Sequence, residues 1–138
     1  MNEKQFLALH RKMSYIPDHP YCTKHGKVYK YRLEVEKIID RYLKPQEQVH
    51  HHYNADGSAT LVLCPNIVYH KLLHIRELAL RMCGNANWRK CTYCKQYDDL
   101  KNMSNNSAGI YHKECKNNYQ RKRRIKNKME GPSNDKIL

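Results

Sequence analysis

Apolar side chains recur at helical spacing in two parts of the chain. Between Arg32 and Leu43 apolar positions alternate with charged ones as in an amphipathic helix, and Pro45 closes the segment. A second helical pattern begins after Asn66, a favourable N-cap residue, and ends at Gly84, where a C-cap glycine belongs. The sequence therefore predicts two helices separated by a non-helical stretch.

Two β-prone runs fill that stretch. Residues 47–53 and 58–64 each predict a strand, and the segment Asn54-Ala55-Asp56-Gly57 between them has the composition of a turn. The order strand, turn, strand, helix over residues 47–83 makes an α+β fold the expected class.

The flanking segments differ in composition from this central part. Residues 1–20 are polar with scattered apolar groups, and we expect a loosely ordered lead-in there. Residues 21–86 form the predicted core domain, 87–116 a Cys-rich annex, and 117–138 a basic tail.

The charge of the chain points to a polyanionic partner. Its 138 residues include 26 Lys and Arg against 13 Asp and Glu, a formal net charge of +13. Such an excess is typical of proteins that bind nucleic acid or an anionic membrane surface. No apolar run approaches the roughly 20 residues of a membrane span, and the first residues lack the apolar region of a signal peptide. We therefore expect a protein that is neither secreted nor membrane-bound.

Histidines are concentrated in the predicted strand and helix. Of the 9 histidines, five fall between residues 50 and 74. His70 and His74 lie four apart and project from one helix face, and one or two of His50, His51 and His52 can reach them from the strand. One interpretation is that three imidazoles bind one metal ion and a further histidine acts as a base. The other is that the two helix histidines merely border a core and the three strand histidines form a solvated strand end.

The cysteines of the annex have the spacing of a zinc site. Cys91 and Cys94 form a CxxC pair, and His112 and Cys115 form an HxxC pair. Seventeen residues separate Cys94 from His112. Two close pairs supply the four ligands of a tetrahedral, structural Zn²⁺. A redox-active CxxC is the main alternative. Disulfides are disfavoured because the chain shows no secretory context.

A basic segment follows the zinc pattern directly. Residues 116–128 hold seven Lys or Arg and no acidic residue. We expect this segment to contact DNA phosphates without reading bases, and a solvated charge run is the alternative. Whether the segment is helical is left open by its uniformly polar pattern. The residues predicted to bind DNA are Arg121, Lys122, Arg123, Arg124 and Lys126.

Two stretches resemble the phage HNH (homing-type) endonucleases. These are HGKVYKYRLEVEKIIDRYLKPQEQVHH and LVLCPNIVYHKLLHIRELALRMCGNANWRKCTYCKQYDD, and the resemblance covers about residues 20–124. It implies a ββα-metal (HNH) core at 47–83, preceded by a strand and helix and followed by a zinc-knuckle annex. By this resemblance His50, His70 and His74 hold the catalytic metal, and His51 is the general base.

The implied activity is metal-dependent hydrolysis of phosphodiester bonds in double-stranded DNA. The resemblance implies that the ion is Mg²⁺, Mn²⁺ or Zn²⁺ and that the enzyme acts in the cytoplasm of a bacterial host. Thr60 stands where the family has an asparagine that orients the base, so either Asn54 or another group substitutes or the site is weakened. The alternative function is a zinc-containing DNA-binding protein with a degenerate site, and RNA binding is a third that rests on charge and Tyr content alone. The register of the base among His50, His51 and His52 stays open.

Overall fold

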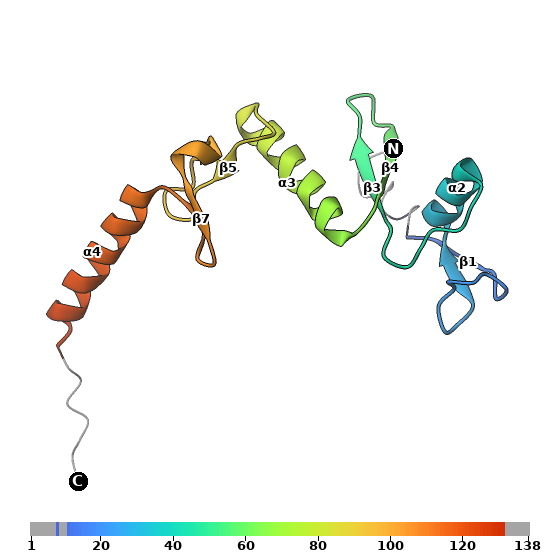
Figure 1. The fold of residues 1–138 in the computed structure, drawn as a ribbon, viewed down its shortest axis with the longest axis horizontal. Coiled ribbons are helices and arrows are strands. Elements are labelled where there is room, and N and C mark those ends of the chain that lie inside the picture. Colours follow the sequence, from blue (N-terminus) through green and yellow to red (C-terminus); the bar gives the residue numbers. More distant parts are fainter. Residues whose placement is uncertain (1–7, 9–10, 132–138) are drawn as a thin grey trace, which may run out of the picture. The chain divides into compact units, whose positions relative to one another are not determined.

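The computed structural model describes residue 8 and residues 11–131 (Figure 1). The chain divides into two compact units, the first ending at His74 and the second beginning at Ile75. The architecture is mixed α and β, with three principal helices and four two-stranded antiparallel sheets among the described residues. The expected α+β class is therefore confirmed.

The first unit begins with a short hairpin. Strand β1 (Met13–Tyr15) pairs with β2 (Lys27–Tyr29), with Met13 opposite Tyr29. The loop between them needs a glycine, because Gly26 has φ 67° and a Cβ there would lie 2.9 Å from the Tyr15 ring. Residues 13–15 lie in the segment expected to be loosely ordered, and for them that prediction is wrong. The rest of that expectation at 1–7 and 9–10 falls outside the described residues.

Helix α2 (Lys30–Ile39) follows β2 directly and ends earlier than predicted. Asp40 takes a left-handed conformation with φ 55° and turns the chain away from the helix. Leu43 belongs to the following loop, where it is fully buried against Val35 and Val49. The prediction that the helix runs to Leu43 is wrong because a buried loop residue continued the apolar pattern.

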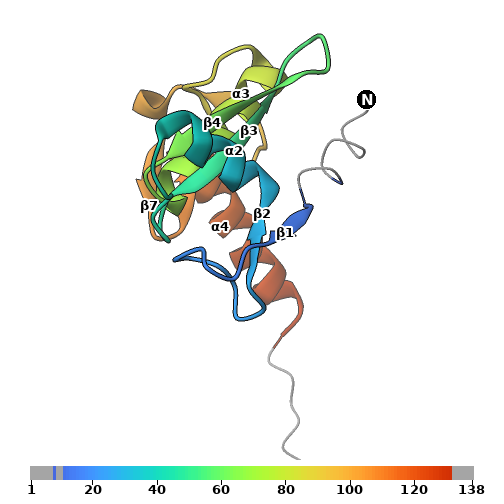
Figure 2. The same cartoon turned by 90° about the vertical axis from the view of Figure 1, so that its right-hand side faces the viewer.

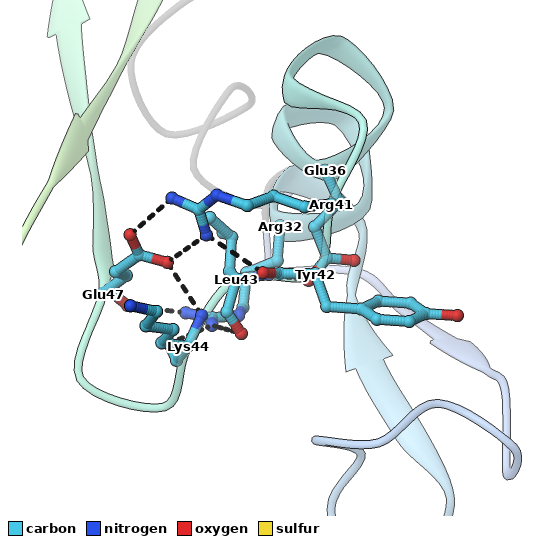
Figure 3. Close-up of polar contacts among 7 residues, drawn as sticks. All are labelled: Arg32, Glu36, Arg41, Tyr42, Leu43, Lys44 and Glu47. Atoms are coloured by element: carbon cyan, nitrogen blue, oxygen red, sulfur yellow. Dashed lines mark hydrogen bonds and ion pairs between the residues drawn. The ribbon is translucent and has the colours of Figure 1, made fainter.

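A cluster of polar contacts organises this loop, residues 40–47 (Figure 3). Arg41 donates two hydrogen bonds to the Glu47 carboxylate, each 2.8 Å long, and the Lys44 backbone N–H donates a third of 2.8 Å. Arg32 of α2 donates to the carbonyl oxygens of Leu43, Lys44 and Glu47. The loop therefore leads into the next strand along a fixed path.

The predicted hairpin is confirmed. Strand β3 (Gln48–Tyr53) pairs antiparallel with β4 (Ala59–Cys64), with His50 opposite Val62 and His52 opposite Thr60. In the turn, the Asn54 backbone N–H donates to the Ser58 carbonyl at 2.9 Å. Val49 of β3 joins the core formed with Val35 and Leu43, and partly buried apolar residues pack around it. These residues are Tyr31, Ile39, Leu61 and Leu63.

Helix α3 (Ile67–Cys83) has the predicted ends. The Asn66 side chain accepts a hydrogen bond from the Tyr69 backbone N–H at 2.9 Å. Gly84 follows the helix with φ 77° and donates to the Leu80 carbonyl at 2.9 Å. Among the described residues, no helix has both the length and the apolarity needed to cross a membrane.

Besides the C-terminal part of α3, the second unit contains two small hairpins and a long helix. Strand β5 (Arg89–Lys90) pairs with β6 (Tyr97–Asp98), and β7 (Ser104–Asn106) pairs with β8 (Gly109–Tyr111). A 3-10 turn, η1 (Leu100–Asn102), connects them, and helix α4 (Lys113–Met129) follows β8. The segment expected to be a Cys-rich loop is thus two hairpins. The basic segment, whose structure the pattern left open, is helical and belongs to α4, the red helix of Figure 1 and Figure 2.

Candidate metal sites

The first unit brings three of the predicted histidine ligands together. The ligand nitrogens of His50, His70 and His74 all lie within 4.8 Å of one another. The Nε2 atoms of His70 and His74 are 3.0 Å apart. The His50 ring centroid is 5.3 Å from that of His70 and 4.5 Å from that of His74. Three imidazoles from a strand and a helix therefore converge on one point.

Local structure explains this convergence. His70 and His74 are one helical turn apart on α3, so their rings project from the same face. His50 is held by β3 and is only 1% exposed, whereas His70 is half-buried and His74 is exposed. Burial, and then the neighbouring His74 and His50 rings, lower the pKa of His70. Low basicity favours the neutral imidazole, which is the form that binds a metal ion.

The donor set fits a divalent transition metal. Imidazole nitrogen is a common ligand of Zn²⁺ and its neighbours, whereas Mg²⁺ prefers oxygen ligands. Three protein ligands also leave coordination positions for water or substrate, as in catalytic zinc sites. His74 is exposed, so an ion held by these three rings would be reachable from solvent. These residues can therefore hold a metal ion that remains accessible.

His51 and His52 lie outside this cluster. Successive strand residues face opposite sides, and the half-buried His51 ring meets the Tyr31 ring at a centroid distance of 5.1 Å and an interplanar angle of 82°. His52 is exposed and stands opposite Thr60 in the hairpin. Sequence reasoning missed Tyr31, because its spacing from His51 carries no signal and only the packing of α2 onto the hairpin brings the two together.

Thr60 lies in β4, next to the hairpin turn. Its hydroxyl accepts a hydrogen bond of 3.1 Å from the Asn54 side-chain amide, which also donates to the Ser58 hydroxyl at 2.9 Å. Asn54 thus links the two ends of the turn. That Asn54 or another group replaces the asparagine of the family in orienting the base stays a prediction. Thr60 itself is exposed, at the turn end of the strand pair.

The second unit forms the predicted Cys3His cluster. The thiol sulfurs of Cys91, Cys94 and Cys115 and a ring nitrogen of His112 all lie within 4.8 Å of one another. The Nδ1 atom of His112 is 3.5 Å from the Cys94 sulfur and 3.7 Å from the Cys115 sulfur. Cys91 follows β5, and Cys115 lies in the first turn of α4. Four ligands of this kind and number can hold Zn²⁺.

The opposite edge of the His112 ring contacts a carboxylate. The Oδ2 atom of Asp98 lies 3.1 Å from the His112 Nε2 atom. Asp98 is itself fixed, because its Oδ1 atom accepts hydrogen bonds from the Asn102 side chain at 2.9 Å and from the Asp99 backbone at 2.6 Å. With the Nε2 proton donated to Asp98, the lone pair of Nδ1 faces the sulfurs, as a zinc ligand requires.

The thiols have very different proton affinities. Burial alone would raise the pKa of Cys91, but hydrogen bonding from the backbone at Cys94, His112 and Tyr93 lowers it to about 6. Burial and the adjacent Cys94 and Cys91 sulfurs raise the pKa of Cys115 to about 11. The first thiolate thus repels further negative charge in the cluster. A bound dication would relieve this repulsion, since metal ligation requires deprotonated thiols.

Helix α4 carries the predicted DNA-binding side chains into solvent. Every residue from Lys113 to Met129 is at least partly exposed. The base of the helix is anchored by Tyr119, whose ring lies 5.1 Å from that of Tyr93, and by Lys116, which donates to the Tyr111 hydroxyl at 3.0 Å. The five predicted DNA contacts lie beyond this anchor and are all exposed. They are Arg121, Lys122, Arg123, Arg124 and Lys126.

Comparisons with protein-family models, with characterised proteins and with solved structures find no match to this chain. The fold and its sites define a mixed α+β protein with two clusters that can hold metal ions, one of three histidines and one of three cysteines and a histidine. The resemblance to HNH endonucleases stays a prediction.

Proposed function

We propose that this protein is a metal-dependent HNH-type endonuclease that hydrolyses phosphodiester bonds in double-stranded DNA. The observation that carries the proposal is the convergence of His50, His70 and His74 within 4.8 Å on a strand–turn–strand–helix unit. A cluster of three imidazoles with one exposed member suits a metal ion that must also bind a substrate oxygen. His51, next to a ligand in the strand, is the proposed general base.

The histidines divide two tasks in the proposed reaction, holding the metal ion and accepting a proton. His50, His70 and His74 hold the ion and so fix its position relative to the hairpin. A divalent ion held there acts as a Lewis acid that stabilises negative charge on the phosphate and the leaving oxygen. His51 accepts a proton from the attacking water. One site of this kind cuts one strand at a time, so a nick is the expected elementary event.

The proposed DNA affinity comes from the second unit. Zinc bound by Cys91, Cys94, His112 and Cys115 would fix the base of α4, and the exposed Lys and Arg of the helix would neutralise phosphates. The net charge of +13 supports a polyanionic partner. We propose a homing-type enzyme that acts in the cytoplasm of a bacterial host, as the resemblance to phage enzymes implies.

A plasmid-nicking assay tests the proposal. Purified protein is incubated with supercoiled plasmid and Mg²⁺, Mn²⁺, Co²⁺ or Zn²⁺, beside the variants His51→Ala and His52→Ala. We expect nicking that His51→Ala abolishes and that His52→Ala retains, because only His51 is assigned as the base. A transition metal should support activity at least as well as Mg²⁺. Activity with Mg²⁺ alone would contradict the three-imidazole ligand set.

The same experiment decides against the enzyme if DNA is bound and never nicked. Binding without nicking in all four metals would favour the alternative, a zinc-containing DNA-binding protein with a degenerate site. One observation favours that alternative. Thr60, at the position where the family has the asparagine that orients the base, stands opposite His52, and its hydroxyl accepts a hydrogen bond from Asn54 of the turn. Tighter binding to RNA than to duplex DNA of equal length would favour the third function.

A further inference from the structure

The proposed base, His51, has an aromatic neighbour on the side of the hairpin away from the histidine cluster. The rings of Tyr31 and His51 meet in an edge-to-face arrangement, with centroids 5.1 Å apart and planes at 82°. Such pairs prefer a defined geometry and contribute more than their buried area alone. The contact therefore restricts the rotation of the imidazole.

Tyr31 is itself held on two sides. Its ring stacks on Tyr29, with centroids 5.3 Å apart and planes at 21°. It also packs against the buried core cluster of Val35, Leu43 and Val49. A side chain held by a stack and by the core is a rigid support, unlike a surface tyrosine with free rotation.

The contact acts through the ring rather than through charge. Burial raises the pKa of Tyr31, so its hydroxyl is neutral at physiological pH. A neutral, packed tyrosine neither takes a proton from water nor binds a metal ion there. What remains is its shape, which limits where the His51 ring can point.

We propose that Tyr31 is a positioning residue that fixes the orientation of the His51 imidazole toward the scissile phosphate. The inference rests on the proposed endonuclease function. In this chain Thr60 replaces the asparagine expected to orient the base, and its hydroxyl is bonded to Asn54 within the turn. Tyr31 limits the orientation of the His51 ring from α2.

Nicking kinetics under the best metal test the proposal. Tyr31→Phe keeps the ring, Tyr31→Leu removes it while keeping an apolar side chain, and Tyr42→Leu is the matched control at an exposed tyrosine whose ring contacts His19. We expect Tyr31→Leu to lower kcat by at least about tenfold with KM nearly unchanged, since misplacing a reacting group slows the chemical step. Tyr31→Phe should retain kcat within about twofold, because the edge-to-face contact needs no hydroxyl.

A spectroscopic readout separates this inference from the enzyme assignment. In protein labelled with ¹³C and ¹⁵N at histidine, the ring signals of His51 are identified by their loss in His51→Ala. Tyr31→Leu should shift these signals by removing the tyrosine ring current, while those of His70 and His74 stay in place. Far-UV circular dichroism and zinc content confirm folding. Tyr31→Met, also apolar, replaces the leucine variant if that one unfolds.

The outcomes are distinguishable. A folded Tyr31→Leu protein with the wild-type kcat, or with His51 signals unmoved, overturns the positioning role. An equal loss of kcat in Tyr42→Leu and Tyr31→Leu overturns it as well, because a general packing defect would then explain both. If wild-type protein nicks nothing with any metal, the endonuclease proposal fails and the catalytic role of Tyr31 fails with it. The His51 signals then still decide whether Tyr31 orients that ring.

Discussion

Replacing Glu47 with glutamine should loosen the loop of residues 40–47, which precedes the strand that carries His50. Glu47 is the last residue before β3, and its carboxylate accepts two hydrogen bonds from Arg41 and one from the Lys44 backbone (Figure 3). Glutamine has nearly the same shape but no charge, and its amide group would present donors to the Arg41 guanidinium. The substitution therefore weakens the contacts of this carboxylate without creating a cavity.

The magnitude follows from the acidity of the carboxyl group. The Arg41 hydrogen bonds, opposed by burial and aided by the Lys44 N–H, lower the pKa of Glu47 from 4.5 to about 2. At about 1.4 kcal/mol for each tenfold change in acidity, the upper limit is about 3 kcal/mol. The Arg41 side chain is 46% exposed, so solvent screens the pair. We expect Glu47→Gln to reduce the free energy of opening by about 1–2 kcal/mol at pH 7.

Native-state hydrogen exchange, read by mass spectrometry, measures this opening. Amides in residues 41–50 should exchange about 5–30-fold faster in Glu47→Gln than in wild type at pH 7, while residues 89–115 serve as an internal control. Because the folded pKa is depressed, the contribution is complete above pH 4.5 and is lost as the pH falls toward 2. The difference between the two proteins should therefore narrow at pH 3.

A matched variant guards against a general charge effect. Glu34→Gln removes the same charge from an exposed position on α2 and should leave exchange in residues 41–50 unchanged. Equal exchange in Glu47→Gln and Glu34→Gln would refute the reasoning. So would a difference between Glu47→Gln and wild type that stays constant from pH 7 to pH 3.

Three further substitutions test other parts of the structure. Asp98→Asn should weaken zinc binding by about 10–100-fold in competition with a chromophoric chelator, because His112 loses its carboxylate partner; unchanged affinity would contradict this role. Leu43→Ala should destabilise the first unit by about 2–5 kcal/mol in urea unfolding, since Leu43 is fully buried, and a loss below about 0.5 kcal/mol would argue against the core assignment. Arg124→Gln should reduce the salt dependence of duplex DNA binding by about one phosphate contact, measured by fluorescence anisotropy; an unchanged slope would remove Arg124 from the interface.

Features set by local sequence were predictable. The ends of α3 follow from Asn66 and Gly84, whose side-chain and backbone preferences act within one turn. The β3–β4 turn likewise follows from Asn54 to Gly57. Both metal clusters could be predicted from the sequence for the same reason. Ligand pairs three or four residues apart, such as His70 and His74, are brought together by the local backbone alone.

Features set by distant contacts were not predictable. The pairing of β1 with β2 joins Met13 to Tyr29, and nothing in residues 13–15 alone distinguishes a strand from an irregular segment. Leu43 continued the apolar pattern of α2 although it belongs to a loop. A loop residue that is buried in the core and a residue on the buried face of a helix are both apolar, so the pattern does not distinguish them. The contact of Tyr31 with His51 arises in the same way, from how α2 packs on the hairpin.

The two units should depend on metal to different extents. The first unit has its own apolar core in Val35, Leu43 and Val49. In the second unit the buried apolar residues among those described are Ala79, Cys91 and Tyr111, and one of these three is a candidate zinc ligand. Its hairpins have only two or three residues per strand, too short for independent stability. Zinc held by the Cys3His cluster would therefore supply much of its folding free energy.

Removing zinc should accordingly unfold the second unit and spare the first. After chelation at neutral pH we expect amide exchange to accelerate throughout residues 89–115 and the fluorescence of Trp88 to change, while residues 48–64 keep their protection. Cys115→Ser should reproduce this pattern without a chelator, and Cys83→Ser, outside the cluster, should not. Unchanged exchange in residues 89–115 after zinc removal would mean that the hairpins hold without metal. Equal loss of protection in both units would mean that they unfold as one, and that the histidine cluster depends on zinc bound by the cysteines.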